Sequence, residues 1–233
     1  MRIAIISDIH SNLEALTKVI EVIDLQSVDK IICLGDIVGY GANPNECVEL
    51  IRQRCDIVIK GNHEDAVEDI SLTEYFTDDA RTAVFWTRKH LTEKNFDYLL
   101  TLPLTYKADD LLFVHASPCN PVEWNYILNN LDASVAFRCF SESICFIGHT
   151  HMPAMFSTNG RASRIIKDER YIVNVGSVGQ PRDGNIELSF GLLDTDTWTY
   201  ENIRAPYDVE ITTRKILNTD LPARLGQRLL MGV

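Results

Sequence analysis

Short apolar runs alternate with amphipathic stretches in the first half of the chain. Three of these runs have the length of buried strands: residues 3–6, 31–34 and 56–59. Apolar residues at helical spacing follow the first run, and the segment from Ser11 to Glu14 fits a capping box that would begin a helix. Asn43 as N-cap and Pro44 in the first turn would begin a second helix. The alternation predicts a largely parallel sheet.

The second half of the chain changes to short β-like segments separated by turns. Six strands are expected there: residues 111–114, 144–147, 154–157, 171–175, 188–193 and 198–203. Helical patterns cover residues 64–102, with Thr77 and Thr92 as N-caps, and return at 128–140 and after Asp208. We find no repeat, low-complexity tract or linker. We therefore expect one domain over residues 1–233, built from two stacked sheets, with a helical tail from about residue 208.

Composition narrows the class of protein. Of the 233 residues 45% are hydrophobic, which is enough for a large core, but no apolar stretch approaches the length of a membrane span. The first strand runs directly into Asp8 and His10, so it does not read as a signal peptide, and we expect a cytoplasmic protein. The net charge of −11 repels phosphate backbones, so polymeric nucleic acid is not an expected partner.

Six cysteines occur without the close spacing of a metal-binding or redox pair: Cys33, Cys47, Cys55, Cys119, Cys139 and Cys145. A chain of this length with a good core has no need of disulfides for stability. We expect all six to be free thiols.

Potential metal ligands gather immediately after the apolar runs. Five of the six histidines are placed there with two aspartates and an asparagine: Asp8, His10, Asp36, Asn62, His63, His115, His149 and His151. Asp8, Asp36 and Asn62 each follow a strand, so they should meet at one edge of a sheet. The oxygen and imidazole set suits manganese, iron, zinc or nickel. If His63 is not counted as a ligand and Asp36 binds both ions, the set supplies four bonds to each of two ions. Such a pair of ions suits catalysis on a phosphoryl group.

These motifs, in this order, resemble those of the calcineurin-like metallophosphoesterases. The series is Asp8-Ile9-His10, Gly35-Asp36, Gly61-Asn62-His63-Glu64, the single His115, and Gly148-His149-Thr150-His151. The resemblance extends from Arg2 to about Arg182, and is closest to the small prokaryotic phosphodiesterases of that superfamily. It implies a four-layer α/β/β/α sandwich of two mixed sheets.

The resemblance also implies roles for individual residues. Asp8, His10 and His151 would hold one metal ion, Asn62, His115 and His149 a second, and Asp36 would bridge them. His63 would be catalytic, acting as an acid toward the leaving oxygen or stabilising its charge. A hydroxide between the metals would attack phosphorus from the opposite side. We expect manganese as the metal, with iron, zinc and nickel as alternatives.

Three further residues are candidates for contact with a small phosphorylated substrate. Arg182 could bind a phosphate through two hydrogen bonds, although a surface salt bridge explains it almost as well. Asn12 is either a helix-start residue or a substrate and ligand-supporting residue. Tyr40 either faces the phosphate or only lies between two glycines of a tight turn. His90, in contrast, has the context of a solvated helix residue.

The function that we expect is hydrolysis of a phosphodiester or a nucleotide-type phosphate. One alternative is symmetrical cleavage of dinucleoside tetraphosphates, which would require several basic residues near the site, such as Arg182, Arg81 or Arg88. Another is a non-catalytic scaffold with the same fold, against which the presence of His63 and every ligand argues. We expect a monomer or a homodimer, with the leucines of the tail packed within the chain.

Overall fold

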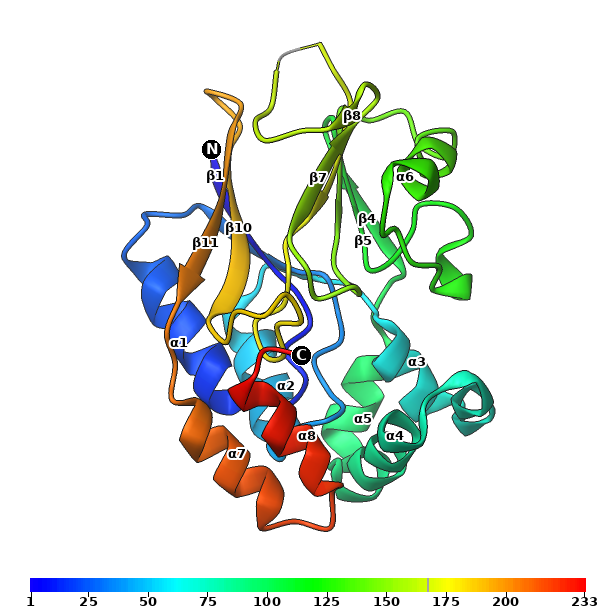
Figure 1. Cartoon of the computed structure of the whole chain (residues 1–233), viewed down its shortest axis with the longest axis vertical. Coiled ribbons are helices and arrows are strands. Elements are labelled where there is room, and N and C mark those ends of the chain that lie inside the picture. Colours follow the sequence, from blue (N-terminus) through cyan, green and yellow to red (C-terminus); the bar gives the residue numbers. More distant parts are fainter. Residues whose placement is uncertain (167) are drawn as a thin grey trace.

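Two mixed β-sheets lie face to face, and helices cover their outer surfaces (Figure 1). The computed structural model describes residues 1–166 and 168–233. Sheet A has the strand order β11-β10-β1-β2-β3: β1 is Arg2–Ile6, β2 Lys30–Cys33, β3 Ile57–Val58, β10 Leu188–Asp194 and β11 Thr199–Ala205. Sheet B has the order β4-β5-β6-β9-β7-β8: β4 is Thr105–Ala108, β5 Leu111–Val114, β6 Ile144–Ile147, β7 Ala154–Ser157, β8 Gly160–Arg161 and β9 Tyr171–Asn174.

Each sheet combines three parallel strands with antiparallel ones, which lie at one edge of sheet A and at both edges of sheet B. In sheet A, β1, β2 and β3 are parallel, whereas β10 runs antiparallel to β1 and β11 antiparallel to β10. In sheet B, β5, β6 and β9 are parallel, and β4, β7 and β8 are antiparallel additions. The parallel strands are buried on both faces, which explains their continuous apolar sequences. Their carboxyl ends point to the same side of the molecule, where the site lies.

Three apolar layers hold the four structural layers together. Residues such as Ile5, Phe113 and Phe146 are buried between the two sheets. The outer face of sheet A is covered by α1 (Leu13–Asp24) and α2 (Pro44–Arg54). The outer face of sheet B is covered by a single short helix, α6 (Asn130–Ala136), and the loop before it. The four-layer α/β/β/α sandwich of two mixed sheets is therefore confirmed.

The remaining helices lie beyond the carboxyl ends of the strands, in the lower part of Figure 1. They are α3 (Asn62–Glu68), α4 (Asp78–His90), α5 (Glu93–Leu100), α7 (Val209–Leu217), α8 (Ala223–Gln227) and the 3₁₀ turns Ile70–Tyr75 and Arg228–Leu230. A third 3₁₀ turn, Pro121–Glu123, lies in the loop before α6. The predicted caps Thr77 and Thr92 are confirmed, because their side chains accept the backbone N–H groups of Ala80 and Asn95.

The capping box predicted at Ser11 is wrong by one residue. Asn12 is the N-cap of α1, and its side-chain oxygen accepts the N–H of Ala15. Ser11 has a φ of +54° and belongs to the loop that carries Asp8 and His10. The carboxylate of Glu14 faces Lys215 of α7 instead of turning back to the helix start.

The prediction that all six cysteines are free is wrong for two of them. Cys119 and Cys139 form a disulfide, with their Cα atoms 5.3 Å apart. Cys119 lies in the loop after β5 and Cys139 follows α6, so the disulfide closes the segment that covers sheet B. Sequence spacing did not reveal it, because 20 residues separate the two cysteines and the loop between them folds back on itself. The other four cysteines are free.

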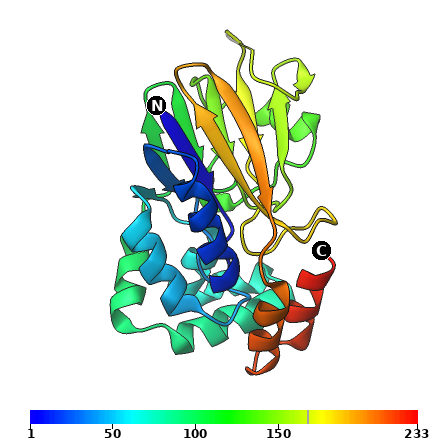
Figure 2. The same cartoon turned by 90° about the vertical axis from the view of Figure 1, so that its left-hand side faces the viewer.

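The C-terminal tail, residues 207–233, packs against the rest of the chain. Figure 2 shows α7 and α8 below the end of β11. Leu221, Leu225 and Leu229 are buried with Ala83 of α4, and Lys215 is paired with Glu14 of α1. Within the described part of the chain, no helix has the length and apolar character needed to cross a membrane.

Candidate metal centre and substrate cavity

Eight polar side chains meet where the carboxyl ends of the parallel strands of both sheets converge. β1 is followed by Asp8 and His10, β2 by Asp36, β3 by Asn62 and His63, β5 by His115, and β6 by His149 and His151. All eight are buried. The structure thus brings together every predicted ligand, and it draws them from both sheets, whereas strand order in the sequence placed only Asp8, Asp36 and Asn62 at one edge.

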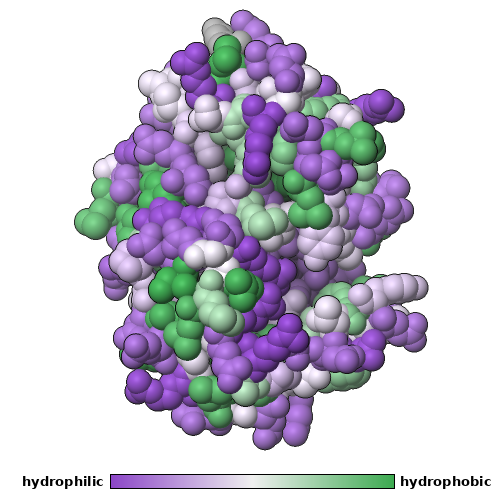
Figure 3. All heavy atoms as spheres, viewed as in Figure 1, coloured by the Kyte–Doolittle hydropathy of each residue, from purple (hydrophilic) through white to green (hydrophobic). Residues whose placement is uncertain are grey.

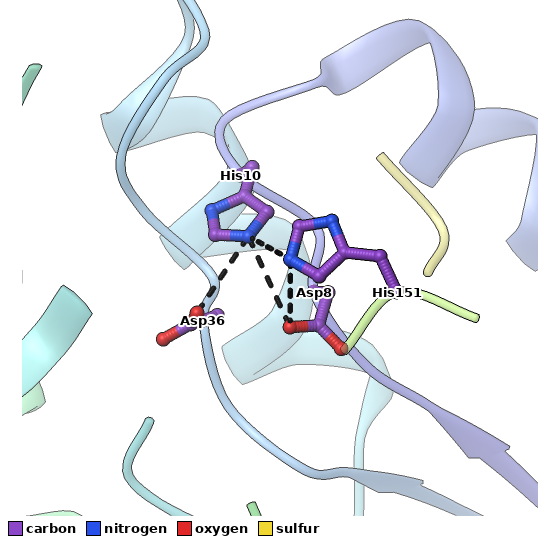
Figure 4. A group of neighbouring side chains, drawn as sticks. All are labelled: Asp8, His10, Asp36 and His151. Atoms are coloured by element: carbon purple, nitrogen blue, oxygen red, sulfur yellow. Dashed lines mark hydrogen bonds and ion pairs between the residues drawn. The ribbon is translucent and has the colours of Figure 1, made fainter. Parts of the chain in front are cut away.

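One group of possible ligands consists of Asp8, His10, Asp36 and His151, which point toward one another (Figure 4). His10 Nε2 lies 3.6 Å from a carboxylate oxygen of Asp36 and 3.9 Å from one of Asp8. His151 Nε2 lies 3.3 Å from the same Asp8 oxygen. Four buried atoms therefore converge with a spacing that suits a single cation.

A second group shares the carboxylate of Asp36 with the first. It consists of Asp36, His115 and His149. His115 Nε2 lies 3.4 Å from a carboxylate oxygen of Asp36 and 3.1 Å from the side-chain oxygen of Asn62. Asn62 therefore supplies a fourth possible ligand, and Asp36 stands between the two groups.

The hydrogen bonds of the histidines leave Nε2 lone pairs directed at these two positions. Nδ1 of His10, His115 and His151 contacts the backbone carbonyl oxygens of Val38, Leu34 and Gln180 at 3.1, 2.9 and 2.6 Å. A carbonyl oxygen only accepts, so each Nδ1 must carry the proton. Burial lowers the pKa of His10 and of His151, which keeps both rings neutral.

Two neutral Nε2 atoms, those of His10 and His151, then face each other at 3.0 Å with no proton between them. His149 Nε2 is buried without a hydrogen-bond partner among the described residues. Bare lone pairs of this kind are unfavourable unless a cation accepts them. The side chains present therefore fit divalent metal ions.

His115 differs from the other histidines of the centre in the direction of its pKa shift. Burial opposes a charge on this ring, but the carboxylates of Asp36 and Asp8 outweigh burial and raise the pKa of His115 to about 9. A cation of the second group would have to displace this proton, since metal binding requires the free lone pair.

His63 lies beside the two groups without belonging to either. Its ring centroid is 4.8 Å from that of His10 and 4.6 Å from that of Tyr40. Burial lowers the pKa of His63 to about 4. Gly39 makes room for this ring: a Cβ atom there would lie 2.2 Å from His63 Nδ1, and the φ of +91° also requires glycine. The interpretation of Gly39 as a residue of a tight turn therefore did not include its close contact with the His63 ring.

Glu64 holds the centre in place, a role that the sequence motif alone did not reveal. Its buried carboxylate accepts the backbone N–H groups of Asp36, Ile37, Val38 and Gly61 at 2.8–3.1 Å. It therefore ties the loop after β2 to the start of α3, which together carry Asp36 and His63. Burial and the nearby Asp36 carboxylate raise the pKa of Glu64 to about 7.

A cavity of about 760 Å³ opens beside the metal centre and is lined by Asn62, His63 and His149. The surface is notched on the right-hand side of Figure 3, where the loop before α6 lies above α3 in Figure 1. Aromatic rings from both sides form its walls. Tyr126 stacks on His149 with ring centroids 4.1 Å apart, and Trp124 donates a hydrogen bond to Asp65.

The three predicted substrate contacts have different surroundings. Arg182 lines the cavity, and its guanidinium donates to the side-chain oxygen of Gln180 and lies 5.8 Å above the ring of Tyr40. Tyr40 also lines the cavity. Asn12 does not: its amide binds Gly179 and caps α1, so its contacts are those of a helix-start residue.

The other basic residues of the cavity are not the expected ones. Arg81 and Arg88 donate to backbone carbonyl groups of their own helical region, including those of Thr73 and Glu68. Arg224 and Arg228 of the tail line the cavity instead. Sequence reasoning missed them, although their spacing of four residues is a signal that both lie on one helix face.

Comparisons with known proteins identify the family of the chain. The profile of the calcineurin-like phosphoesterase superfamily domain matches residues 1–198. An uncharacterized protein of Methanocaldococcus jannaschii is 41% identical over 241 residues, covering 99% of this chain and 98% of the relative. A metallophosphoesterase from Sphaerobacter thermophilus superposes with a TM-score of 0.90 at 37% identity, over 100% of this chain and 99% of the other.

A hypothetical protein from Pyrococcus horikoshii shares the fold over 100% of this chain and 98% of its own, with a TM-score of 0.86 and 20% identity. The architecture, the buried histidine and carboxylate groups and these matches lead to one conclusion: the chain belongs to the calcineurin-like phosphoesterase superfamily.

Proposed function

We propose that the protein hydrolyses phosphodiesters or nucleotide-type phosphates with two divalent metal ions. The observation that carries the proposal is the carboxylate of Asp36, which is shared by two groups of buried ligands. Asp8, His10 and His151 would hold one ion with Asp36, and Asn62, His115 and His149 would hold the other. The mixed oxygen and imidazole ligands suit manganese, with iron, zinc or nickel as alternatives.

The bound ions would supply Lewis acidity, which neutralises phosphate oxygens and makes water a better nucleophile near neutral pH. The remaining chemistry belongs to the chain. His63 lies at the cavity wall beside the ligands, where it would donate a proton or a hydrogen bond to the leaving oxygen. Glu64 fixes the backbone that carries Asp36 and His63, so the geometry is set before substrate binds.

The cavity supports a small substrate. Its volume is within the range of pockets that enclose small molecules, and Trp124 and Tyr126 offer rings for a base or another planar group. The overall charge of −11 disfavours polymeric nucleic acid as a substrate.

A cytoplasmic location and a monomeric or dimeric state remain predictions. The disulfide between Cys119 and Cys139 is a feature more typical of oxidising compartments or hyperthermophiles.

The test compares His63→Asn with the parent after both are stripped of metal and reloaded with manganese. Initial rates would be measured on bis-p-nitrophenyl phosphate, p-nitrophenyl phosphate and diadenosine tetraphosphate. We expect the parent to prefer the diester, and His63→Asn to lose roughly 10²–10⁴-fold in rate while its metal content is unchanged. Preference for the tetraphosphate, with ADP as the sole product, would replace the diesterase assignment by symmetrical hydrolysis.

The same substitution at His90 provides a matched control. His90 is exposed on α4 and stacks on Trp86, away from the cavity lining, so His90→Asn should retain the parent rate. If the parent binds two metals but cleaves none of the three substrates, the proposal fails and the scaffold alternative takes its place.

A further inference from the structure

Three arginines from the C-terminal side of the chain line the cavity: Arg182, Arg224 and Arg228. Arg182 lies in the loop after β9, whereas Arg224 belongs to α8 and Arg228 to the 3₁₀ turn that follows it. The last two lie beyond the segment matched by the family profile, which ends at residue 198. The tail therefore adds side chains to the site that the family region does not contain.

Helical spacing explains how the tail presents these arginines. Leu225 and Leu229 are four residues apart and are buried in a cluster that also contacts Tyr40. Arg224 and Arg228 precede them by one position each, so they share the adjacent face of the same helical segment. That face lines the cavity, while the leucines anchor the segment. Tyr40 connects this leucine cluster to the metal centre, because its ring also packs on that of His63.

The positive charge of these arginines is only partly compensated. Arg224 has one carboxylate nearby, that of Asp79 at 3.7 Å, and this exposed pair holds it weakly. Among the described residues, Arg182 has no Asp or Glu carboxylate within 4.0 Å, whereas Arg228 Nε donates to an oxygen of Val233. Burial and the proximity of Arg182 lower the pKa of Arg228. Three arginine side chains that line one cavity, in a protein of net charge −11, favour an anion beside them.

We propose that Arg224 and Arg228, together with Arg182, form a second anion subsite that binds a phosphate group of the substrate other than the one cleaved. The proposal rests on the proposed function and deepens it, because the substrate would then carry at least two phosphate groups. The cleaved group would lie at Asn62, His63 and His149, and the second at the arginine wall of the same cavity. Planar guanidinium groups suit such a ligand, since each can donate two parallel hydrogen bonds to phosphate oxygens.

The first test needs neither metal nor turnover. Binding of inorganic pyrophosphate to the metal-stripped full chain would be measured by titration calorimetry. The double variant Arg224→Gln/Arg228→Gln should bind roughly tenfold more weakly or worse. Arg138→Gln/Arg214→Gln is the matched control, because it removes the same charge from exposed positions outside the cavity lining, and it should bind as the parent does.

The second test uses AMP and ADP as competitive inhibitors of bis-p-nitrophenyl phosphate hydrolysis by the manganese-loaded enzyme. The parent should bind ADP about tenfold more tightly than AMP, and the arginine double variant should lose that preference. Unaltered pyrophosphate binding by the double variant would overturn the subsite. If the diester is never hydrolysed, the proposed function fails, and the calorimetric result still decides whether the subsite exists.

Discussion

The backbone at the metal centre adopts a conformation that L-amino acids rarely tolerate. Five of the seven proposed ligands have φ between +49° and +64°: Asp8, His10, Asp36, His149 and His151. Such a residue costs about 1–2 kcal/mol relative to an ordinary backbone conformation. The surrounding hydrogen bonds maintain it; the carboxylate of Asp8, for example, accepts the N–H of His149. The side chains are thereby aimed at the metal positions before any ion binds.

This strain can be measured at His149 by comparing two substitutions that remove the same ring. We expect His149→Gly to be more stable than His149→Ala by about 1 kcal/mol in urea unfolding of the metal-free protein, because glycine adopts φ of +64° without a Cβ clash. The same pair at Glu49, exposed within α2, should give the reverse order by about 1 kcal/mol. An alanine variant at residue 149 as stable as the glycine one would exclude the strain.

Individual residues of the centre differ in how well their roles could be predicted. Each proposed ligand follows an apolar run, so residue type and strand ends sufficed to select the set. The role of Glu64 could not be predicted in this way, because its four partners are backbone groups from another loop. Asn12 was ambiguous for a related reason, since an asparagine that caps a helix and one that binds a ligand have the same local sequence.

At the scale of elements, the buried strands were predictable, whereas two short strands without a buried residue, β4 and β8, were not. The predicted limits of β5, β6 and β7 agree with the structure to the residue, because continuous apolar runs bounded by turns have few other interpretations. β4 was missed, since its side chains alternate between exposed and half-buried and it pairs on one side only. Two stacked sheets were expected from the pattern of elements, whereas the four-layer order with helices outside both sheets was supplied by family resemblance.

The loop between β5 and α6 contains little regular secondary structure, and we expect its disulfide to contribute to the stability of the fold. It carries Trp124 and Tyr126 of the cavity wall, but α6 alone covers this part of sheet B. Closing a loop of about 20 residues is worth roughly 3 kcal/mol through the unfolded chain. We expect a thiol reductant to lower the free energy of unfolding by about that amount, measured by urea titration.

The variant Cys119→Ser/Cys139→Ser is the control for this experiment. It should have the stability of the reduced parent and should not respond to reductant. A Cys47→Ser variant, which changes a buried free thiol, should keep the full response. Equal stability of the oxidised and reduced parent would show that the disulfide contributes nothing to the fold.

For the whole molecule, the metal centre is a connection between the two sheets. Asp8 and Asp36 extend from sheet A, and His115 and His149 from sheet B. Bound cations would therefore stabilise the packing of one sheet on the other. Manganese at 100-fold its Kd should raise the free energy of unfolding by about 2.7 kcal/mol. This corresponds to an increase of roughly 5–10 °C in Tm for a chain of this length.

Calorimetric melting of the chelator-treated and the manganese-loaded protein would measure this increase. His63→Asn should show the same increase as the parent, because His63 is not a proposed ligand, whereas Asp36→Asn should lose most of it. A Tm that is independent of manganese would mean that the ions do not connect the sheets.

The wide distribution of the ligands along the chain has a consequence for synthesis. Asp8 is synthesised before His151, which follows it by roughly 7–30 s at the usual rate of translation. β1 cannot complete its pairing in sheet A until β10, its antiparallel neighbour, has been synthesised. A cation captured by the emerging chain would find only part of its ligands and could exchange freely. We therefore expect the bound metal to be set by the ions that the chain meets after both sheets have formed.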